Sequence, residues 1–534
     1  MIANSGTRCG VLYAPADEIL QGQGGSEAAG KDPAADDDGG GGERFAASRA
    51  RFEQILDWLD ARDTGGLEHG ELERRLASVG RELLCCLFQD HLDLRAVREE
   101  RLEPVADAQG VERRAVEQGH QRSLDSVFGE VTVGRLAYRA RGEENLYPAD
   151  GILNLPVEHA SHGVRRLAAL EAAAGSFEHA NDRLCEWTGL TLGKRRIEQL
   201  VLRAVVDFEG FYAEHAVDEQ ERDERDVLVL SADGKGIVMR SEALREATAR
   251  AAQRASPKLK TRLSRGEKAN RKRIAEVGAV YELTPAPRTA ADVLAPTSEK
   301  TLPAPKAKDK WLTASVVDDA ATVVAAIFDE GERRDPSHKR TWVALVDGNN
   351  HQIDRIKAEA KQRKVKVTII VDFVHVLEYI WSAAWSFFPE GDPNAEQWVH
   401  EKALAILDGN AGNVAAAIRR KATRLNLPAE KRAKADRTAD YLLNKRPYLD
   451  YRTALKNGWP IATGVIEGAC RHLVKDRMDI TGARWGLQGA EAILKLRALI
   501  SNGDFHTYWD YHLTHERHRN HDLRYLNSVI PREA

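Results

Sequence analysis

The 534-residue sequence lacks several features that would assign it to a familiar class of protein. It has no run of about eighteen apolar residues, so no membrane-spanning helix is predicted. The formal net charge is only −4, so overall basicity does not indicate a nucleic-acid partner and local charge has to be considered instead. The five cysteines show no CxxC spacing, which argues against a disulfide framework or a cysteine zinc site; they are Cys9, Cys85, Cys86, Cys185 and Cys470.

The beginning of the chain also lacks the basic-then-apolar order of a signal peptide. Together with the scattered cysteines, this absence predicts a soluble intracellular protein in a reducing compartment. The sequence contains no internal repeat. Its length is too great for one ordinary core and predicts about three or four domains.

The first part of the chain is predicted to be mainly helical. Residues 1–43 are rich in Gly, Ala, Asp and Gln and are expected to be disordered, because they cannot bury enough apolar surface to offset the entropy of ordering. Apolar residues then recur at helical spacing from 44 to 102, which predicts a helical core or a dimer seam. The alternation in SVFGEVTVGRLAYRA (126–140) predicts a strand with a bend at Gly129 or Gly134.

A helix, a glycine-containing turn and a second helix are predicted in 176–208. The second helix opens with Lys194, Arg195 and Arg196. A helix-turn-helix DNA reader makes base and phosphate contacts near the start of its second helix, so these three cations are candidate DNA contacts. A plain pair of packed helices has the same pattern and remains an alternative.

From Asp226 onward the pattern changes to strands that alternate with helices. The alternation in the later part predicts an α/β layer with parallel strands. A basic segment from Arg245 to Arg273 separates the first two strands and is either a solvated or mobile helix or a surface that attracts a phosphate backbone. Strands are predicted in 226–240, 276–285, 311–318, 341–350 and 365–375, and a helical, basic block in 376–458.

Three acids in this part suggest one chemical site. Asp233 ends the first buried strand and Asp347 ends a later one. Glu467 follows a glycine-bounded turn on a helix, and Arg471 and Lys475, four and eight positions on, are expected to lie over it. If the two strands are neighbours, the carboxylates meet at one edge of the sheet, where they suit one or two Mg²⁺ ions. Two such ions promote in-line phosphodiester displacement.

Five segments then carry a resemblance to a known family. They read LSADGKG, WVALVDGNN, VDFVHVLEY, YLLNKRPYLDY and TGVIEGACRHLVKDRMDITGARW. With them the chain resembles the ISKra insertion-sequence family of DDE transposases, in the broader Mutator-like grouping, over about residues 124–525. In that grouping an Asp-x-x-His or Cys-x-x-His pair follows the second acid, and an all-helical insertion precedes the glutamate. Asp372 and His375 match the pair, and residues 376–458 match the insertion.

The resemblance implies an α/β RNase H-like catalytic domain with a mixed five-stranded sheet flanked by helices. An all-α insertion interrupts it, and a mainly α region containing a small β element precedes it. The expected parts are a disordered tail (1–43), a helical region (44–123), a small β element with a helix-turn-helix-like DNA-binding region (124–225), the first part of the core (226–375), the insertion (376–458), the last part of the core (459–502) and a basic, His-rich and aromatic tail (503–534).

The resemblance also implies an activity and its residues. Asp233, Asp347 and Glu467 would be the catalytic metal ligands for Mg²⁺ or Mn²⁺, with two ions expected. The implied function is DNA transposition, in which the protein binds terminal inverted repeats, cleaves DNA and joins the 3′-hydroxyl to target DNA. A homodimer or higher oligomer is expected in synapsis, in the nucleoid-associated cytoplasm of a prokaryote.

Basic residues in four segments are the candidate contacts with double-stranded DNA. They are expected to neutralise phosphates largely without reading sequence. The set consists of Lys194, Arg195, Arg196, Lys235, Lys258, Lys260, Arg262, Arg271, Lys272, Arg273, Arg471 and Lys475.

Alternatives remain for single residues of the site. Asp372 also ends a buried strand and competes with Asp347 as the second acid, with His375 interpreted as an orienting group rather than a ligand. Trp485 is interpreted as a core residue, with base stacking on a flipped nucleotide as the alternative. Three acids compete with Glu467 but lack its glycine-bounded context; they are Asp476, Asp479 and Glu491.

Alternatives also remain for the function and for the C-terminal segment. The chain could instead be a catalytically inactive or domesticated transposase-derived DNA-binding protein, or a structure-specific nuclease that cuts without joining. In 505–525, His512, His515, His518 and His521 follow one another by threes. No cysteine or acid completes a standard zinc set, so a solvated or DNA-facing helix is predicted there.

Overall fold

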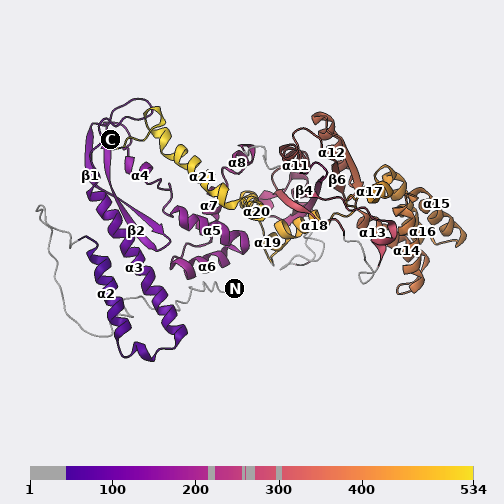
Figure 1. Ribbon diagram of the computed structural model, residues 1–534, viewed down its shortest axis with the longest axis horizontal. Helices are drawn as coiled ribbons and strands as arrows, with labels where there is room; N and C mark the ends of the chain where they lie inside the picture. The colour runs from indigo at the N-terminus through magenta and orange to yellow at the C-terminus, as the bar shows by residue number, and fades with distance from the viewer. Residues whose placement is uncertain are drawn as a thin grey trace, which may run out of the picture. The chain divides into compact units, whose positions relative to one another are not determined.

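The computed structural model describes residues 44–214, 223–254, 259, 271–295, 304–480 and 482–532 (Figure 1). The tail predicted to be disordered and the basic residues Lys258, Lys260 and Arg262 lie outside the described residues. The chain divides into two compact units, which are treated separately here. The first comprises Met1–Asp207 and Thr507–Ala534, and the second Phe208–His506.

The first unit begins with two long helices, α2 (Ala46–Asp60) and α3 (His69–Val97), joined through a short 3-10 helix, η1 (Thr64–Gly66). The helical periodicity predicted in this region is therefore confirmed. Ile55 packs against Val79, and the Ser48 hydroxyl donates to Asp90 Oδ2 at 2.6 Å. Because the partner on α3 moves back from Asp90 to Val79 as α2 advances from Ser48 to Ile55, the two helices run antiparallel.

A two-stranded antiparallel sheet follows, made of β1 (Ala115–Ser126) and β2 (Gly129–Arg139). The strand predicted in 126–140 is confirmed as β2, and Gly129, with φ 140°, lies at the hairpin turn. The sequence pattern missed β1, because its residues (AVEQGHQRSLDS) are largely polar and mostly not buried. Strand β2 instead carries the apolar side chains, with Val131 and Val133 packed near Leu92 of α3.

Helices complete the first unit. Helices α5, α6 and α7 pack against one another, and α6 and α7 are the helix pair predicted in 176–208. In the turn between these two, the Asn181 side-chain oxygen accepts from the amides of Leu192 and Gly193 at 3.0 and 3.1 Å. The elements are α4 (Pro148–Ile152), α5 (His162–Ala174), α6 (Phe177–Thr188), α7 (Lys194–Arg203), η7 (Asp522–Arg524), η8 (Leu526–Ser528) and α21 (Phe505–Asn520), which belongs to this unit from Thr507.

A buried ion-pair network fixes α21 to α5. The Arg165 side chain is fully buried, and its Nη1 donates to Glu158 Oε1 and to Glu516 Oε1 at 2.8 Å each. A buried guanidinium needs such partners, because an unpaired buried charge is very costly. The C-terminal helix is therefore a structural part of the first unit.

The prediction of a solvated or DNA-facing C-terminal helix is wrong for His512 and His521, whereas His518 is 56% exposed. His512 is 1% exposed and its Nδ1 lies 2.6 Å from Asp207 Oδ2, and His521 is also buried. Burial alone would raise the pKa of Asp207, but hydrogen bonds from His512 and Arg519 outweigh it and lower this pKa to about 2. The periodicity of polar residues misled the prediction, because these polar groups satisfy one another inside the unit.

The second unit contains a five-stranded mixed sheet with strand order β5-β4-β3-β6-β7. Strand β3 pairs antiparallel with β4 and parallel with β6, β4 pairs antiparallel with β5, and β6 pairs parallel with β7. The predicted mixed α/β sheet is confirmed. The strands are β3 (Val227–Val238), β4 (Lys272–Leu283), β5 (Lys308–Ser315), β6 (Trp342–Val346) and β7 (Val367–Val371).

Helices flank this sheet (Figure 1). Helix α11 packs on β3, β4 and β5, and α20 packs on β5. At Gly278 of β4 an added Cβ would lie 2.5 Å from Ile327 Cγ2, so glycine permits the close approach of α11. The flanking helices are α8 (Phe208–Glu214), η2 (Ser241–Ala243), α9 (Glu246–Arg254), α10 (Ala290–Leu294), α11 (Ala320–Arg334), α12 (Asn350–Arg363) and α20 (Leu487–Asn502).

Between β7 and Thr463 the chain is helical, and it shares one apolar core with the sheet. The buried Tyr451 hydroxyl, for example, donates to the Val371 carbonyl at 2.8 Å. None of the described helices is long and apolar enough to cross a membrane. The elements are α13 (Phe373–Phe387), α14 (Pro393–Leu407), α15 (Ala411–Arg424), α16 (Ala429–Lys445), η5 (Arg446–Tyr448) and α17 (Tyr451–Lys456), followed by α18 (Gly464–Ala469), the π-helix η6 (Cys470–Lys475) and α19 (Asp476–Met478).

The Arg165 network generates a prediction about stability. Arg165→Ala should lower the opening free energy of the α5 amides by about 3–5 kcal/mol, because it leaves Glu516 buried without its cation. Native-state hydrogen exchange of the full chain measures this quantity. Arg139→Ala is the matched control; it breaks an ion pair with Glu117 whose side chains are 48% and 45% exposed, and should cost less than about 1 kcal/mol. Equal losses in the two variants would contradict the assigned role of Arg165.

Candidate active site

Asp233, Asp347 and Asp372 lie at the same level on three neighbouring strands, at one edge of the sheet in the second unit. The parallel register pairs Ser231 with Leu345, so continuing it by two residues sets Asp233 level with Asp347. It also pairs Val346 with Val371, so one further residue sets Asp347 level with Asp372. Neighbouring strands lie about 4.8 Å apart, so parallel pairing brings these acids into one neighbourhood.

Asp233 lies within β3, is half-buried and uses both carboxylate oxygens. Its Oδ1 accepts from the Gly234 amide at 2.6 Å, and its Oδ2 accepts from the Cys470 thiol at 3.4 Å. Burial, and then the negative charge of Asp233, raises the pKa of the Cys470 thiol, so the thiol remains protonated and can donate. Sequence reasoning missed Cys470 as a neighbour of the site. Its position three residues after Glu467 could have indicated it, because residues three apart on a helix lie close together.

Asp347 follows β6 and is half-buried. Its Oδ1 accepts from the Asn349 amide at 2.7 Å, which closes a turn typical of aspartate. The Tyr441 hydroxyl of α16 donates to the Asp347 carbonyl at 3.3 Å. Gly348 has φ 97°, and a Cβ there would lie 2.7 Å from the Tyr441 hydroxyl oxygen, so this position requires glycine. The helical block therefore supports the turn that holds Asp347.

Asp372 has a different environment from the other two acids. It is 3% exposed and caps α13, with its Oδ1 accepting from the Val374 amide at 3.0 Å. The Thr463 hydroxyl donates to its Oδ2 at 2.9 Å. His375, one turn into α13, lies 3.1 Å from Glu378 and packs against the Tyr441 ring. Asp372 therefore connects the end of β7 to the segment before Glu467.

Glu467 is exposed on α18, which lies against β3 and β4. Its Oε1 lies 3.1 Å from the Thr463 hydroxyl, which also contacts Asp372. Cys470, one turn beyond Glu467, contacts Asp233. Through Thr463 and Cys470 the chain therefore brings Glu467 beside both the β7 end and the β3 strand. Thr463 was another neighbour that sequence reasoning missed.

The two cations expected to lie over Glu467 follow it in a segment where the helix changes type. Residues 470–475 form a π-helix, which has i→i+5 hydrogen bonding. Arg471 is 78% exposed and its Nε lies 3.8 Å from Asp476, and Lys475 is also exposed. Both cations remain available to an external phosphate.

The competing residues of this region have other roles. Glu491 is buried, and it accepts from the Ser315 hydroxyl at 2.9 Å and from the Val316 amide at 2.8 Å, so it fixes the end of β5. The core assignment of Trp485 is confirmed: it is 6% exposed and its indole donates to the Met478 carbonyl at 3.0 Å. Asp476 and Asp479 are exposed.

The donor set suits Mg²⁺ or Mn²⁺ in its chemistry, because Asp233, Asp347 and Glu467 all offer carboxylate oxygens. Glu467 is exposed, and the other two acids are half-buried. Within the described part of the chain, however, no group of three or more His, Cys, Asp or Glu side chains is already arranged to hold a metal ion. The residues therefore fit a divalent cation by type and by position at one edge, without a preassembled coordination shell.

The candidate DNA contacts lie on both units. Lys194 and Arg195 are exposed at the start of α7, whereas Arg196 is paired with Asp125 at 2.5 Å. Lys235 is exposed two residues after Asp233. Arg195 and Lys235 are therefore open to solvent phosphate groups, whereas Lys194 would exchange an exposed ion pair with Glu178, at 3.1 Å, for a phosphate contact.

In the basic segment, β4 begins at Lys272, four residues before the predicted start. The reason is that Lys272 and Arg273 continue the antiparallel pairing, opposite Val238 and Ile237. The Arg273 guanidinium donates through Nε to the Val316 carbonyl at 2.7 Å, and Arg271 is half-buried just before the strand. Arg273 therefore also stabilises the local fold.

No protein-family model matches this chain, and no curated protein matches its sequence.

The contacts of Asp372 generate a prediction. Asp372→Ala should destabilise the second unit by about 2–4 kcal/mol, because it removes a helix cap and the acceptor of the buried Thr463 amide and hydroxyl. Asp450→Ala is the matched control, since it removes the cap of α17 at an exposed position and should cost about 1 kcal/mol. Hydrogen exchange of the α13 and α17 amides reports both values. An Asp372→Ala loss no larger than the control would contradict the structural role of Asp372.

Proposed function

We propose that this chain is a DNA transposase with an RNase H-like catalytic domain, of the ISKra type within the Mutator-like grouping. The observation that carries the proposal is the arrangement of Asp233 and Asp347 on adjacent parallel strands with Glu467 beside them, connected through Cys470 and Thr463. Acids from three distant segments at one sheet edge are typical of metal-dependent phosphoryl transfer.

The architecture around the acids supports this proposal. The strands and the longer helices run in the order β3, β4, β5, α11, β6, α12, β7, with η2 and the nine-residue α9 between β3 and β4 and the five-residue α10 between β4 and β5. It corresponds to the β-β-β-α-β-α-β order that the resemblance implies. Helices α13 to α17 occupy the place of the expected all-α insertion, between the second acid and the glutamate.

Asp233, Asp347 and Glu467 would hold the divalent metal, with Asp372 and His375 supporting them. When bound, a pair of Mg²⁺ or Mn²⁺ ions would supply activation of the attacking oxygen and charge stabilisation of the leaving oxygen. The chain's own groups orient the carboxylates: the Cys470 thiol holds Asp233, the Asn349 amide holds Asp347, and Thr463 holds Glu467.

Exposed cations near these acids would position the scissile strand. Lys235 follows Asp233 on β3, and Arg471 and Lys475 project from η6. Ammonium and guanidinium groups bind phosphate oxygens through charge-assisted hydrogen bonds. In this proposal they align a phosphodiester with the carboxylates, first for hydrolysis at the element end and then for attack by the 3′-hydroxyl on target DNA.

The first unit would bind the terminal inverted repeats through α6 and α7. Helix α7 opens with exposed Lys194 and Arg195, which is the region where a helix-turn-helix unit contacts DNA. We further propose action in the cytoplasm of a prokaryote, at the nucleoid, with a homodimer or higher oligomer in the synaptic complex.

Glu467→Gln tests the catalytic assignment. The variant should bind element-end DNA as the wild type does but lose Mg²⁺-dependent cleavage and joining by roughly 100-fold or more, because an amide is a poor ligand for a hard cation. The assay follows a labelled end duplex through cleavage and strand transfer. Asp476→Asn is the matched control, because Asp476 is an exposed acid nine residues further along the same helical segment.

Each outcome of this assay separates the proposal from its alternatives. Retained cleavage by Glu467→Gln would contradict the assignment of the triad. If the wild-type protein binds DNA without cleaving it, the chain is an inactive DNA-binding relative. If it cleaves DNA without forming joined products, it is a nuclease.

A second prediction concerns α7. Replacing Lys194 and Arg195 together by Ala should weaken end binding and reduce the slope of log K against log salt concentration by about 2, one for each phosphate contact. Fluorescence anisotropy at several salt concentrations measures the slope. Arg225→Ala, at a position 88% exposed in the second unit, is the control and should leave the slope unchanged. An unchanged slope in the double variant would place the DNA path away from α7.

A further inference from the structure

Helices α2 and α3 carry an apolar face that nothing in the described chain covers. Their mutual contact buries only Ile55 and Val79 fully, with Trp58 and Leu83 partly buried. Six large apolar side chains beside this contact are 37–48% exposed; they are Phe52, Leu56, Leu59, Leu76, Leu84 and Leu87. They expose roughly 500 Å² of apolar surface, which is the size of patch that often marks an interaction site.

The exposed residues lie on one side of the helix pair. Leu56 directly follows the buried Ile55 on α2, and Leu84 directly follows Leu83 on α3. Each exposed stripe is therefore rotated by one residue from the α2–α3 contact. Because the two helices are antiparallel, the same rotation brings both stripes to the same side.

The stripe on α3 continues along the helix with alternating steps of four and three residues. This is the spacing of a seam that packs against another helix. Its members are Gly80, Leu84, Leu87, His91, Leu94 and Arg98.

Gly80 is the most informative position of this seam. It lies in the interior of a 29-residue helix, where glycine is less favourable than alanine. An added Cβ would meet no atom within 4 Å, so nothing inside the chain requires glycine there. A second helix crossing closely at this point would require it.

The seam is complementary to itself in the antiparallel sense. If Leu84 of one copy faces Leu87 of a second copy, the same register sets Gly80 opposite His91 and Glu73 opposite Arg98. A small residue then faces a large one, and an acid faces a base. A parallel arrangement would instead bring Arg98 against its own copy. An isologous two-fold contact needs this kind of self-complementarity.

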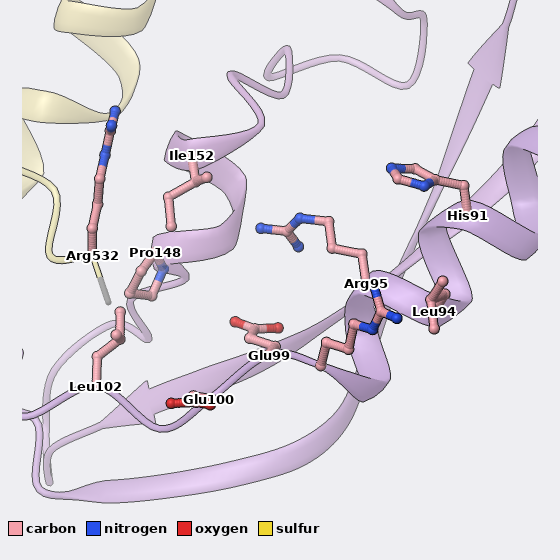
Figure 2. Close-up of a pocket in the computed structure, with 10 residues that line it drawn as sticks. His91, Leu94, Arg95, Glu99, Glu100, Leu102, Pro148, Ile152 and Arg532 are labelled. Atoms are coloured by element: carbon pink, nitrogen blue, oxygen red, sulfur yellow. The ribbon is translucent and has the colours of Figure 1, made fainter. Parts of the chain in front are cut away.

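A groove lies at the end of the seam (Figure 2). It holds about 500 Å³, with His91, Leu94 and Arg95 of α3 on one side and Ile152 of α4 on the other. Arg95 Nη1 is buried and has no hydrogen-bond partner within the described chain. Glu99 and Glu100 also line the groove.

We propose that this face binds a second copy of the same chain, with the two α3 helices packed antiparallel about Leu84 and Leu87, and with Gly80 of each copy closely approached by His91 of the other. Together the two copies would bury roughly 1,000 Å² of apolar surface, which reaches the range of specific interfaces. The proposal does not depend on the proposed enzymatic function.

Gly80→Ala tests the close crossing in the full-length chain. The substitution should raise the dimer dissociation constant at least tenfold in sedimentation equilibrium, while the thermal midpoint of the monomer stays equal or rises, because alanine favours the helix. Gly412→Ala is the matched control, since its Cβ would also meet nothing in a helix, α15, away from the seam. A monomeric wild type at tens of micromolar, or an unchanged dissociation constant for Gly80→Ala, would overturn the proposal.

A charge exchange tests the orientation. Glu73→Arg and Arg98→Glu should each weaken self-association, because each creates like-charged pairs across the two-fold axis. An equimolar mixture of the two variants should form a heterodimer at least tenfold tighter than either homodimer, since both pairs then become opposite in sign. Failure of the mixture to associate more tightly than the single variants would overturn the antiparallel register.

Discussion

Parallel pairing of β3 with β6 is the constraint on which the candidate site depends. Leu228, Leu230, Val343 and Leu345 are completely buried along this pairing, so a shift in register would displace a whole layer of the core. The buried Ser231 hydroxyl also donates to the Leu345 carbonyl across the two strands, at 2.8 Å. With the register fixed, residues 233 and 347 stand level although 114 positions separate them, and β7 adds residue 372 by the same rule.

The third acid depends on a different set of contacts. Glu467 is on a short helix, so its position follows from its neighbours rather than from a strand register. Thr463 joins it to the buried Asp372, and Cys470 joins the same segment to Asp233. Tyr441 of the helical block also supports the turn at Asp347. The helical block between β7 and α18 is thus part of the support of the site, because it closes on the sheet edge from which the acids project.

Sequence reasoning predicted the elements of this unit well, because buried strands such as TWVALVDGNN are continuous apolar runs that end in Asp-Gly. It missed β1, whose side chains are mostly polar, and it missed Cys470 and Thr463, whose roles depend on contacts over 237 and 91 positions. It also assumed a regular α-helix after Glu467, whereas residues 470–475 form a π-helix. Local patterns carry no information about such distant partners. The buried C-terminal histidines were misinterpreted for the same reason.

The central claim is that Asp233, Asp347 and Glu467 act as one metal-binding set, whereas Asp372 does not bind the metal and holds the segment before Glu467 in place through Thr463. Titration of the full-length chain with Mn²⁺, followed by electron paramagnetic resonance, tests it most directly. Asp233→Asn, Asp347→Asn and Glu467→Gln should each weaken Mn²⁺ binding by roughly tenfold or more, and folded Asp372→Asn should bind within about threefold of the wild type. Loss of Mn²⁺ binding in Asp372→Asn with normal binding in Asp347→Asn would contradict the account.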